Sequence, residues 1–279
     1  LVLEPAIRKG EDAESVHDMR VAIRRVRTAL RLFEDMVPGW ADGLRNELRW
    51  IAQTLGRLRD LDVQRGWLVA SSEDVPAEDR AVLHVLDDVF VARRIDAQNA
   101  LVDALDSTRF ERLRTELASL ARGPGLASVE AQRPIGEVAP PLVVRRYRAM
   151  QAAGRKLGPH SPTAELHAFR IRTKRVRYAI EFVAPLYGKP AFSLTKQLTR
   201  LQDLLGDLHD AELAAHRLRE YAAEPDIELP ANAAFVLGAL SERSARRARK
   251  LRRRFPKRFE RVRGDRWKDL KKTMTHRAE

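Results

Sequence analysis

The sequence predicts an all-α protein made of two similar helical bundles, and three observations lead to that prediction. Apolar residues recur at spacings of three and four along most of the chain, as expected for helices with one buried face. No segment alternates apolar and polar residues between turn dipeptides, so strands are not expected. Hydrophobic residues make up 44% of the 279 residues and aromatic residues only 6%, a composition typical of packed helices.

The two bundles are predicted because the chain repeats itself once. Residues 16–33 (VHDMRVAIRRVRTALRLF) align with residues 166–183 (LHAFRIRTKRVRYAIEFV) at a shift of 150 residues. At the same shift LGRLRDLD, which begins at Leu55, aligns with LGDLHDAE, which begins at Leu205. One residue away from that register, RFERLR at Arg109 matches RFERVR at Arg258. Three ordered matches indicate an internal repeat.

Each repeat is expected to contain about four helices, a number suited to a bundle. In the first repeat the helical pattern covers residues 14–37, 43–69, 78–104 and 108–120, and in the second it covers 164–186, 192–221, 231–255 and 257–273. A further helix at 142–157 has only the short segment 1–9 as its counterpart. Glycines and prolines interrupt the pattern at 123–141. We therefore expect a first repeat at 1–122, a linker at 123–141 and a second repeat at 142–279.

The first helix of the first repeat carries a row of basic residues on one face. Within an arc of about 80° on a helical wheel lie His17, Arg20, Arg24, Arg27 and Arg31. Apolar residues gather on the opposite side, namely Met19, Ala22, Ile23, Val26, Ala29, Leu30, Phe33 and Val37. Like charges at this spacing destabilise a helix, so an anionic ligand is expected to lie against them.

The second repeat carries the same row, which consists of His167, Arg170, Lys174 and Arg177, with Glu181 in the place of Arg31. A solvated charged face is the alternative interpretation of either row. A single histidine is also more often structural than functional. Recurrence of both histidines beside the same basic residues favours a binding role.

Further basic residues are candidates for a second tier of ligands. They lie one turn apart on the second helix of each repeat, as Arg45 and Arg49 and as Lys196 and Arg200. Ordinary surface ion pairs explain them about as well. On the same helices, Gly56 and Gly206 are expected to permit close approach of helices, and Asp60 and Asp210 to orient nearby arginines.

The most basic segment of the chain is 243–258, which contains no acidic residue. One face of the predicted helix carries Arg243, Arg246, Arg247, Lys250, Arg253, Arg254 and Lys257, and another carries Ala245, Ala248, Leu251 and Phe255. We expect Pro256 to end or kink this helix. Membranes, calmodulin-like partners and nucleic acids also bind such helices, but the few bulky apolar residues disfavour a membrane.

Net charge points to a polyanionic partner, because 52 Lys and Arg against 39 Asp and Glu give a formal charge of +13. Arginine dominates the basic segments, and its planar guanidinium holds phosphate oxygens in pairs. The absence of cysteine excludes disulfides and thiolate metal sites and fits a cytoplasmic protein. No segment has the length and apolar character of a membrane span.

Catalytic and cofactor motifs are missing from the sequence. It has no phosphate-binding glycine loop, no HExxH and no GxSxG. Arginine stands one turn after His17 and after His167, which disfavours a metal site, and no carboxylate partner is expected within helical reach on either row. We therefore expect no enzyme activity, no cofactor and no metal. A helical DNA- or RNA-binding protein stays open as the alternative, although base-stacking aromatics are not evident.

Both basic rows resemble the signature helix of CHAD domains, the conserved histidine α-helical domains. The resemblance extends to LGRLRDLDV in the first repeat and LGDLHD in the second. The resemblance spans nearly the whole chain. It implies two bundles related by pseudo-two-fold symmetry, forming one compact unit with a basic central groove or pore that binds inorganic polyphosphate. It also implies that a CYTH domain, which is often fused ahead of CHAD, precedes Leu1 or associates with the chain.

Overall fold

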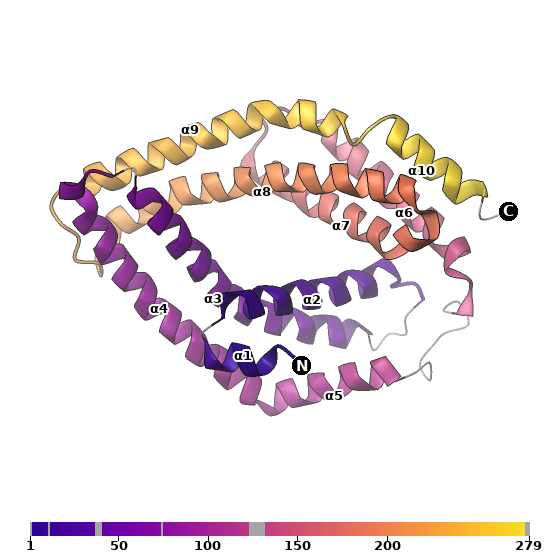
Figure 1. Cartoon of the computed structure of the whole chain (residues 1–279), viewed down its shortest axis with the longest axis horizontal. Coiled ribbons are helices and arrows are strands. Elements are labelled where there is room, and N and C mark those ends of the chain that lie inside the picture. The colour runs from indigo at the N-terminus through magenta and orange to yellow at the C-terminus, as the bar shows by residue number, and fades with distance from the viewer. Residues whose placement is uncertain (1, 11, 37–40, 74, 123–131, 277–279) are drawn as a thin grey trace. The chain divides into compact units, whose positions relative to one another are not determined.

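Helices joined by short non-helical segments make up the part of the chain that the structure, a computed structural model, describes: residues 2–10, 12–36, 41–73, 75–122 and 132–276. The elements in chain order (Figure 1) are α1 (Glu4–Lys9), α2 (Ala13–Leu32), α3 (Ala41–Ser72), the 3-10 helix η1 (Ala77–Asp79), α4 (Arg80–Asp106), α5 (Thr108–Arg122), α6 (Ile135–Gly154), α7 (Thr163–Tyr187), α8 (Lys189–Ala223), α9 (Ala233–Glu260) and α10 (Asp265–His276). The predicted all-α class is confirmed for these residues.

Residue contacts divide the chain into two compact units, which we describe separately. Unit 1 comprises Leu1–Gln132 and Glu224–Val236, and unit 2 comprises Arg133–Ala223 and Leu237–Glu279. The pseudo-two-fold relation and the central basic groove or pore stay predictions. So do the boundaries expected at 122 and 141, and residues 123–131 of the expected linker lie outside the described residues.

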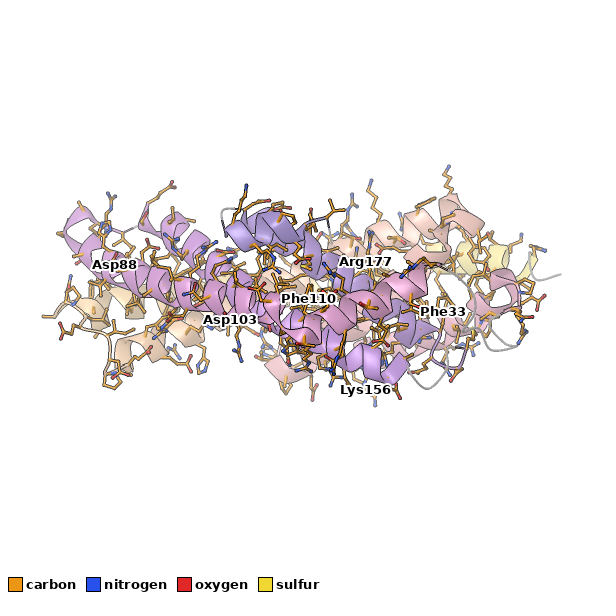
Figure 2. All side chains as sticks on the ribbon, turned by 90° about the horizontal axis from the view of Figure 1, so that it is seen from below. Phe33, Asp88, Asp103, Phe110, Lys156 and Arg177 are labelled. Atoms are coloured by element: carbon orange, nitrogen blue, oxygen red, sulfur yellow. The ribbon has the colours of Figure 1, made fainter. Side chains whose placement is uncertain are left out.

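The core of unit 1 lies between α2, α3, α4 and α5, with α1 packed against α2. Its buried apolar side chains come from every one of these helices: Ile7, Val16, Met19, Ile23, Leu44, Leu48, Ile51, Leu55, Leu58, Leu101, Leu105, Phe110 and Leu113. Phe110, labelled in Figure 2, is the aromatic contribution of α5 and is 5% exposed. Burial of this apolar surface orients α2, so that its basic row lies beside α3.

Capping fixes where α2 begins, because Asp12 accepts hydrogen bonds from the backbone N–H groups of Glu14 (2.9 Å) and Ser15 (3.1 Å). The helix ends at Leu32, earlier than the expected residue 37, and Val37 itself lies outside the described residues. Of the predicted apolar face, Met19 and Ile23 are buried, whereas Val26 is 37% exposed. The buried stripe of α2 is therefore narrower than the wheel predicts.

Unit 2 is built on α7 and α8, which lie side by side (Figure 1), with α6 against α7 and α10 against α6, α7 and α8. Three phenylalanines join α7 to α9. The ring of Phe169 meets Phe255 and Phe259 edge to face, with centroids 5.5 Å and 5.4 Å apart, and Phe255 and Phe259 stack at 5.9 Å. Edge-to-face and offset pairs of this kind add to the stabilisation from burial alone.

Two helix boundaries were predicted wrongly at prolines, the start of α6 and the end of α9. α6 begins at Ile135, not at 142, and includes Pro140 and Pro141. Pro140 has no N–H to give to the carbonyl of Gly136, but the Tyr187 hydroxyl lies 3.5 Å from that carbonyl oxygen and donates to it. A side chain from α7 thus gives a long, weak hydrogen bond to a carbonyl that the proline leaves without its helical donor.

The expected new helix from 257 was wrong, because α9 continues through Pro256 to Glu260. The other part of the expectation, a kink at Pro256, stays a prediction. A proline inside a helix costs about 3 kcal/mol. Phe255 and Phe259, on either side of it, are both buried in the phenylalanine cluster, and this packing offsets the cost. Lys257 consequently belongs to the same helix as the other predicted basic residues of α9.

Candidate functional site

In unit 1 the basic row of α2 lies against α3, and Arg20 shows how. The Arg20 guanidinium lies over Gly56, since a Cβ added at Gly56 would be only 2.9 Å from Arg20 Nη1. The same Nη1 lies 4.0 Å from Asp60 Oδ1. Burial lowers the pKa of Arg20, as do the charges of Arg24 and Arg59, while Asp60 acts in the opposite direction. Asp60 is thus the carboxylate near Arg20, at a distance too long for a hydrogen bond, so its predicted orienting role stays a prediction. Gly56 makes room for a side chain of α2.

The next tier of this surface contains Arg27 and Arg31 of α2 together with Arg49 of α3. Burial lowers the pKa of Arg27, and the charges of Arg49 and Arg31 lower it further, which indicates that the three cations lie close together. Arg45 is not part of the tier, because it forms ion pairs with Glu34 at 3.3 Å and with Asp42. These ion pairs fit the alternative interpretation of Arg45 as an ordinary surface residue, and its role as a ligand stays a prediction. We call the remaining set the α2–α3 surface: His17, Arg20, Arg24, Arg27, Arg31, Arg49 and Arg59.

His17 has acidic neighbours that the sequence analysis did not expect. Ligand atoms of Glu14, His17 and Asp18 all lie within 4.8 Å of one another. Glu14 is one turn before His17 and Asp18 is the next residue, so both carboxylates are within helical reach. The expectation that no carboxylate accompanies this histidine was wrong. His167 has alanines at the equivalent positions, Ala164 and Ala168, so the two histidines differ in their surroundings.

In unit 2 the first tier repeats the arrangement of unit 1 with one replacement. Arg170 lies beside Gly206, where an added Cβ would be 3.8 Å from Arg170 Nη2. His209 occupies the position of Arg59, and its ring lies 4.8 Å from the ring of His167. Nδ1 of His167 and Nε of Arg170 are buried and have no hydrogen-bond partner in the structure.

The pKa of His209 is lowered by burial and by the nearby charges of His167 and Arg170, against the opposing effect of Asp210 and Glu212. An anion placed here would favour the protonated form of His209. His209 was not among the predicted site residues. The sequence does contain a signal for this residue, because the repeat shift of 150 residues aligns His209 with Arg59.

The second tier of unit 2 is neutralised internally. Arg177, labelled in Figure 2, forms an ion pair of 2.8 Å with Glu181, and its guanidinium lies 4.5 Å from the centroid of the Tyr178 ring. Glu181 stands where unit 1 has Arg31. Lys174 of the same row is half-buried. The two repeats therefore do not present equal charge, as the Arg31 to Glu181 difference predicted.

Unit 2 instead concentrates cations in a cavity of about 560 Å³ between α8 and α9, which we call the α8–α9 groove. Six basic residues line it, together with Asp203, Asp207, Leu204 and Leu251: Arg200, Arg253, Arg254, Lys257, Arg258 and Arg261. Four of the six were predicted. Arg258 and Arg261 were missed because the helix was expected to break at Pro256. Lys196 is exposed on α8 and does not line the groove.

The remaining predicted residues of α9 lie outside the groove. Arg246 pairs with Glu242 at 3.0 Å, and Arg247 lies 3.8 Å from Asp207. Arg243 and Lys250 are exposed. The predicted separation of faces is correct, because Ala248, Leu251 and Phe255 are buried on the other side of α9.

Arg252 holds α9 in place, although the sequence analysis did not single it out. Its Nε donates to Glu212 Oε1 at 2.7 Å, and its Nη2 donates to Thr163 Oγ1 at 2.8 Å. Its Nη1 donates to the carbonyl oxygens of Pro159, at 3.4 Å, and Ser161. The side chains of Arg252 and Glu212 are each only 16% exposed. This network ties α9 to α8 and to the segment that leads into α7, and so fixes one wall of the groove.

Among the described helices, none is both long enough and apolar enough to cross a lipid bilayer.

Comparison with known proteins places the chain in a family. The family model of the CHAD domain matches residues 1–219. Two curated proteins of Mycobacterium tuberculosis, Uncharacterized protein MT2285 of strain CDC 1551 / Oshkosh and Uncharacterized protein Rv2226 of strain ATCC 25618 / H37Rv, are each 28% identical to it over 234 residues. These matches cover 80% of this chain and 43% of each relative, so the chain spans less than half the length of these curated relatives.

Solved structures have the same fold. PptA from Streptomyces chartreusis superposes with a TM-score of 0.74 at 21% identity, over 92% of this chain and 94% of that one. The crystal structure of the CHAD domain from the plant Ricinus communis superposes with a TM-score of 0.70 at 27% identity, over 89% of this chain and 82% of that one. A family model that matches most of the sequence, together with the fold of a solved CHAD domain, shows that this chain belongs to the CHAD family.

Proposed function

We propose that this chain binds inorganic polyphosphate, and that the α8–α9 groove of unit 2 is its main contact surface. The observation that carries the proposal is the lining of the groove, where six Arg and Lys side chains face only two carboxylates. Guanidinium groups hold phosphate oxygens through paired, charge-assisted hydrogen bonds. The α2–α3 surface of unit 1 supplies a second set of arginines for the same ligand.

The absence of aromatic rings from the lining of the groove favours polyphosphate over a nucleic acid as the ligand. Proteins that bind single strands without sequence preference combine a basic groove with aromatic rings on which bases stack. None of the residues that line this groove is aromatic. A linear chain of phosphates needs only the cations, and the family resemblance described above implies the same ligand.

The proposed role is that of a binding module rather than an enzyme, used for targeting, storing or regulating polyphosphate in the cytoplasm. The cluster of Arg170, His167 and His209 beside one another favours binding, because an anion nearby would offset their mutual repulsion. No cofactor is part of the proposal.

The test is a competition assay on wild-type protein and on two matched triple variants. Arg254→Gln/Lys257→Gln/Arg261→Gln removes three charges from the groove, and Arg266→Gln/Lys271→Gln/Lys272→Gln removes three exposed charges of α10 in the same unit. The groove variant should bind long-chain polyphosphate at least about tenfold more weakly, since each charged hydrogen bond contributes about 1.5 to 3 kcal/mol, and the α10 variant should bind like wild type.

In the same assay, polyphosphate should displace DNA at equal phosphate concentration. Displacement of polyphosphate by DNA would support the nucleic-acid alternative instead. Equal losses in the two triple variants would show that only net charge matters and would overturn the groove as the site.

A further inference from the structure

Unit 2 contains a second cavity, of about 520 Å³, between α6 and the turn that joins α9 to α10. Its lining differs in kind from that of the α8–α9 groove. It includes the aromatic rings of Tyr147 and Trp267, the amide of Gln151, one carboxylate, that of Glu260, and the guanidinium groups of Arg148, Arg155 and Arg263. The volume lies within the range of small-molecule sites in proteins, about 300 to 1,000 Å³.

The aromatic side of this cavity is formed by two rings that contact each other and the surrounding backbone. Trp267 of α10 stacks on Tyr147 of α6 with centroids 3.6 Å apart and planes 9° from parallel. Tyr147 is buried, its hydroxyl donates to the carbonyl of Val262 at 2.8 Å, and it accepts from Gln151 Nε2 at 3.0 Å. Trp267 is only half-buried, so part of its indole surface lines the cavity.

The cationic side is formed by Arg148 of α6 and by Arg155, the residue that caps the C-terminal end of this helix. Arg148 and Arg155 are seven residues apart, which places them two helical turns, about 10 Å, from each other. Both side chains are exposed, and neither forms an ion pair within the part of the chain that the structure describes. Arg263, by contrast, is paired with Glu260 and lies 5.7 Å from the centroid of Phe259. Arg148 and Arg155 are therefore the cations that an anionic ligand would meet first.

We propose that this cavity binds a nucleotide, with the base against Trp267 and the phosphates on Arg148 and Arg155. The α8–α9 groove is lined by cations without aromatic rings, which suits a chain of phosphates. The second cavity places a fixed aromatic surface beside two cations, and a nucleotide is the ligand class that has both a flat ring to stack and phosphates to pair. The proposal does not depend on polyphosphate binding.

Calorimetric titration of the whole chain with ATP, tripolyphosphate and adenosine tests the proposal, because the three ligands separate the base from the phosphates. Trp267→Leu should weaken ATP binding about tenfold through loss of stacking and leave tripolyphosphate binding unchanged. Arg148→Gln/Arg155→Gln should weaken ATP binding by at least about tenfold. The double variant keeps the proposal testable if Trp267→Leu fails to fold, because both arginines are exposed.

Arg172→Gln/Arg219→Gln, which removes two exposed charges from α7 and α8, is the matched control and should bind ATP like wild type. Wild-type ATP affinity in the double variant would overturn the proposal. So would equal weakening of ATP and tripolyphosphate by Trp267→Leu, which would indicate a plain phosphate site. Long-chain polyphosphate binding should be unchanged in all these variants, so a failure here is distinguishable from a failure of the α8–α9 groove.

Discussion

Arg20 and Arg170 each extend a guanidinium across a helical position that has no side chain. The glycines beneath them, Gly56 and Gly206, were expected to permit close approach of helices, but the nearest atoms to an added Cβ belong to these arginines. The contact is much closer at Gly56, 2.9 Å, than at Gly206, 3.8 Å. The same sequence signature therefore places its arginine closer to the glycine in one repeat than in the other.

Alanine at the two glycines should have different effects. Gly206→Ala should raise the free energy of unfolding by about 0.5 to 1 kcal/mol, the usual gain inside a helix, because 3.8 Å is an ordinary contact, and polyphosphate affinity should not change. Gly56→Ala should displace Arg20 and weaken polyphosphate binding to the α2–α3 surface. Denaturant titration and binding isotherms measure both quantities. Identical behaviour of the two variants would contradict the arrangement.

His209 should make polyphosphate binding depend on pH. Its pKa is lowered in the folded protein by burial and by His167 and Arg170, so below its ordinary value of about 6.5 the unfolded chain binds more protons. Stability contributed by neutral His209 is thus present above that pH and is lost as the pH falls through the lowered pKa. A bound polyanion favours the proton, so affinity should rise as the pH falls below about 6.5, by about tenfold for one charged contact.

His209→Gln removes this titration, and His209→Arg supplies the fixed charge that Arg59 has in unit 1. Binding measured from pH 5 to 8 should show a flatter profile for both variants and tighter binding at pH 8 for the arginine variant. A wild-type profile in His209→Gln would assign the pH dependence to other groups.

At the scale of helices, α9 combines a dense cationic face with a single anchoring arginine. Sequence periodicity predicted this face well, because its apolar and basic residues lie on opposite sides of one helix. The continuation of α9 past Pro256 and of α6 across Pro140 depends on contacts with α7: Phe169 packs against Phe255 and Phe259, and Tyr187 donates to Gly136. The sequence rules for proline consider only the helix itself and not contacts with a neighbouring helix, so both boundaries were predicted wrongly.

Loss of the anchor should destabilise unit 2 far more than loss of an exposed arginine on the same helix. Arg252→Met leaves Glu212, which is 16% exposed, without its partner, and should lower the free energy of unfolding by about 3 kcal/mol. Arg249, whose side chain is 56% exposed and pairs with Glu242, provides the control, and Arg249→Met should unfold like wild type in denaturant titrations. Equal stability of the two variants would show that Arg252 does not anchor α9.

For the molecule as a whole, the net charge of +13 and the internal repeat predicted a polyanion-binding surface in each half. The rows on α2 and α7 were found because both recur at one shift. The pairing of Arg45 with Glu34, the neutralisation of Arg177 and the α8–α9 groove depend on how helices pack against one another. A single sequence does not show these distances, so the distribution of charge between the units was only partly predictable.

Polyphosphate affinity should fall steeply with salt, because each neutralised phosphate releases counterions. By analogy with nucleic acids, contact with three or more phosphates should lower affinity at least about tenfold between 50 and 200 mM salt. Arg20→Glu/Arg24→Glu and the groove triple variant should each bind more weakly and with a smaller salt dependence. Isotherms at four salt concentrations give the slopes, and a flat wild-type response would exclude binding through many phosphates.

The lining of the α8–α9 groove also determines the heat signature of binding. Leu204 and Leu251 are the apolar residues among those that line it, and both are already buried. A polyphosphate chain itself has no apolar surface, so its binding removes almost none from water. Since the heat-capacity change of association follows apolar burial, the enthalpy of the proposed polyphosphate binding should stay nearly constant with temperature. A base that covers Trp267 should instead give a negative heat-capacity change.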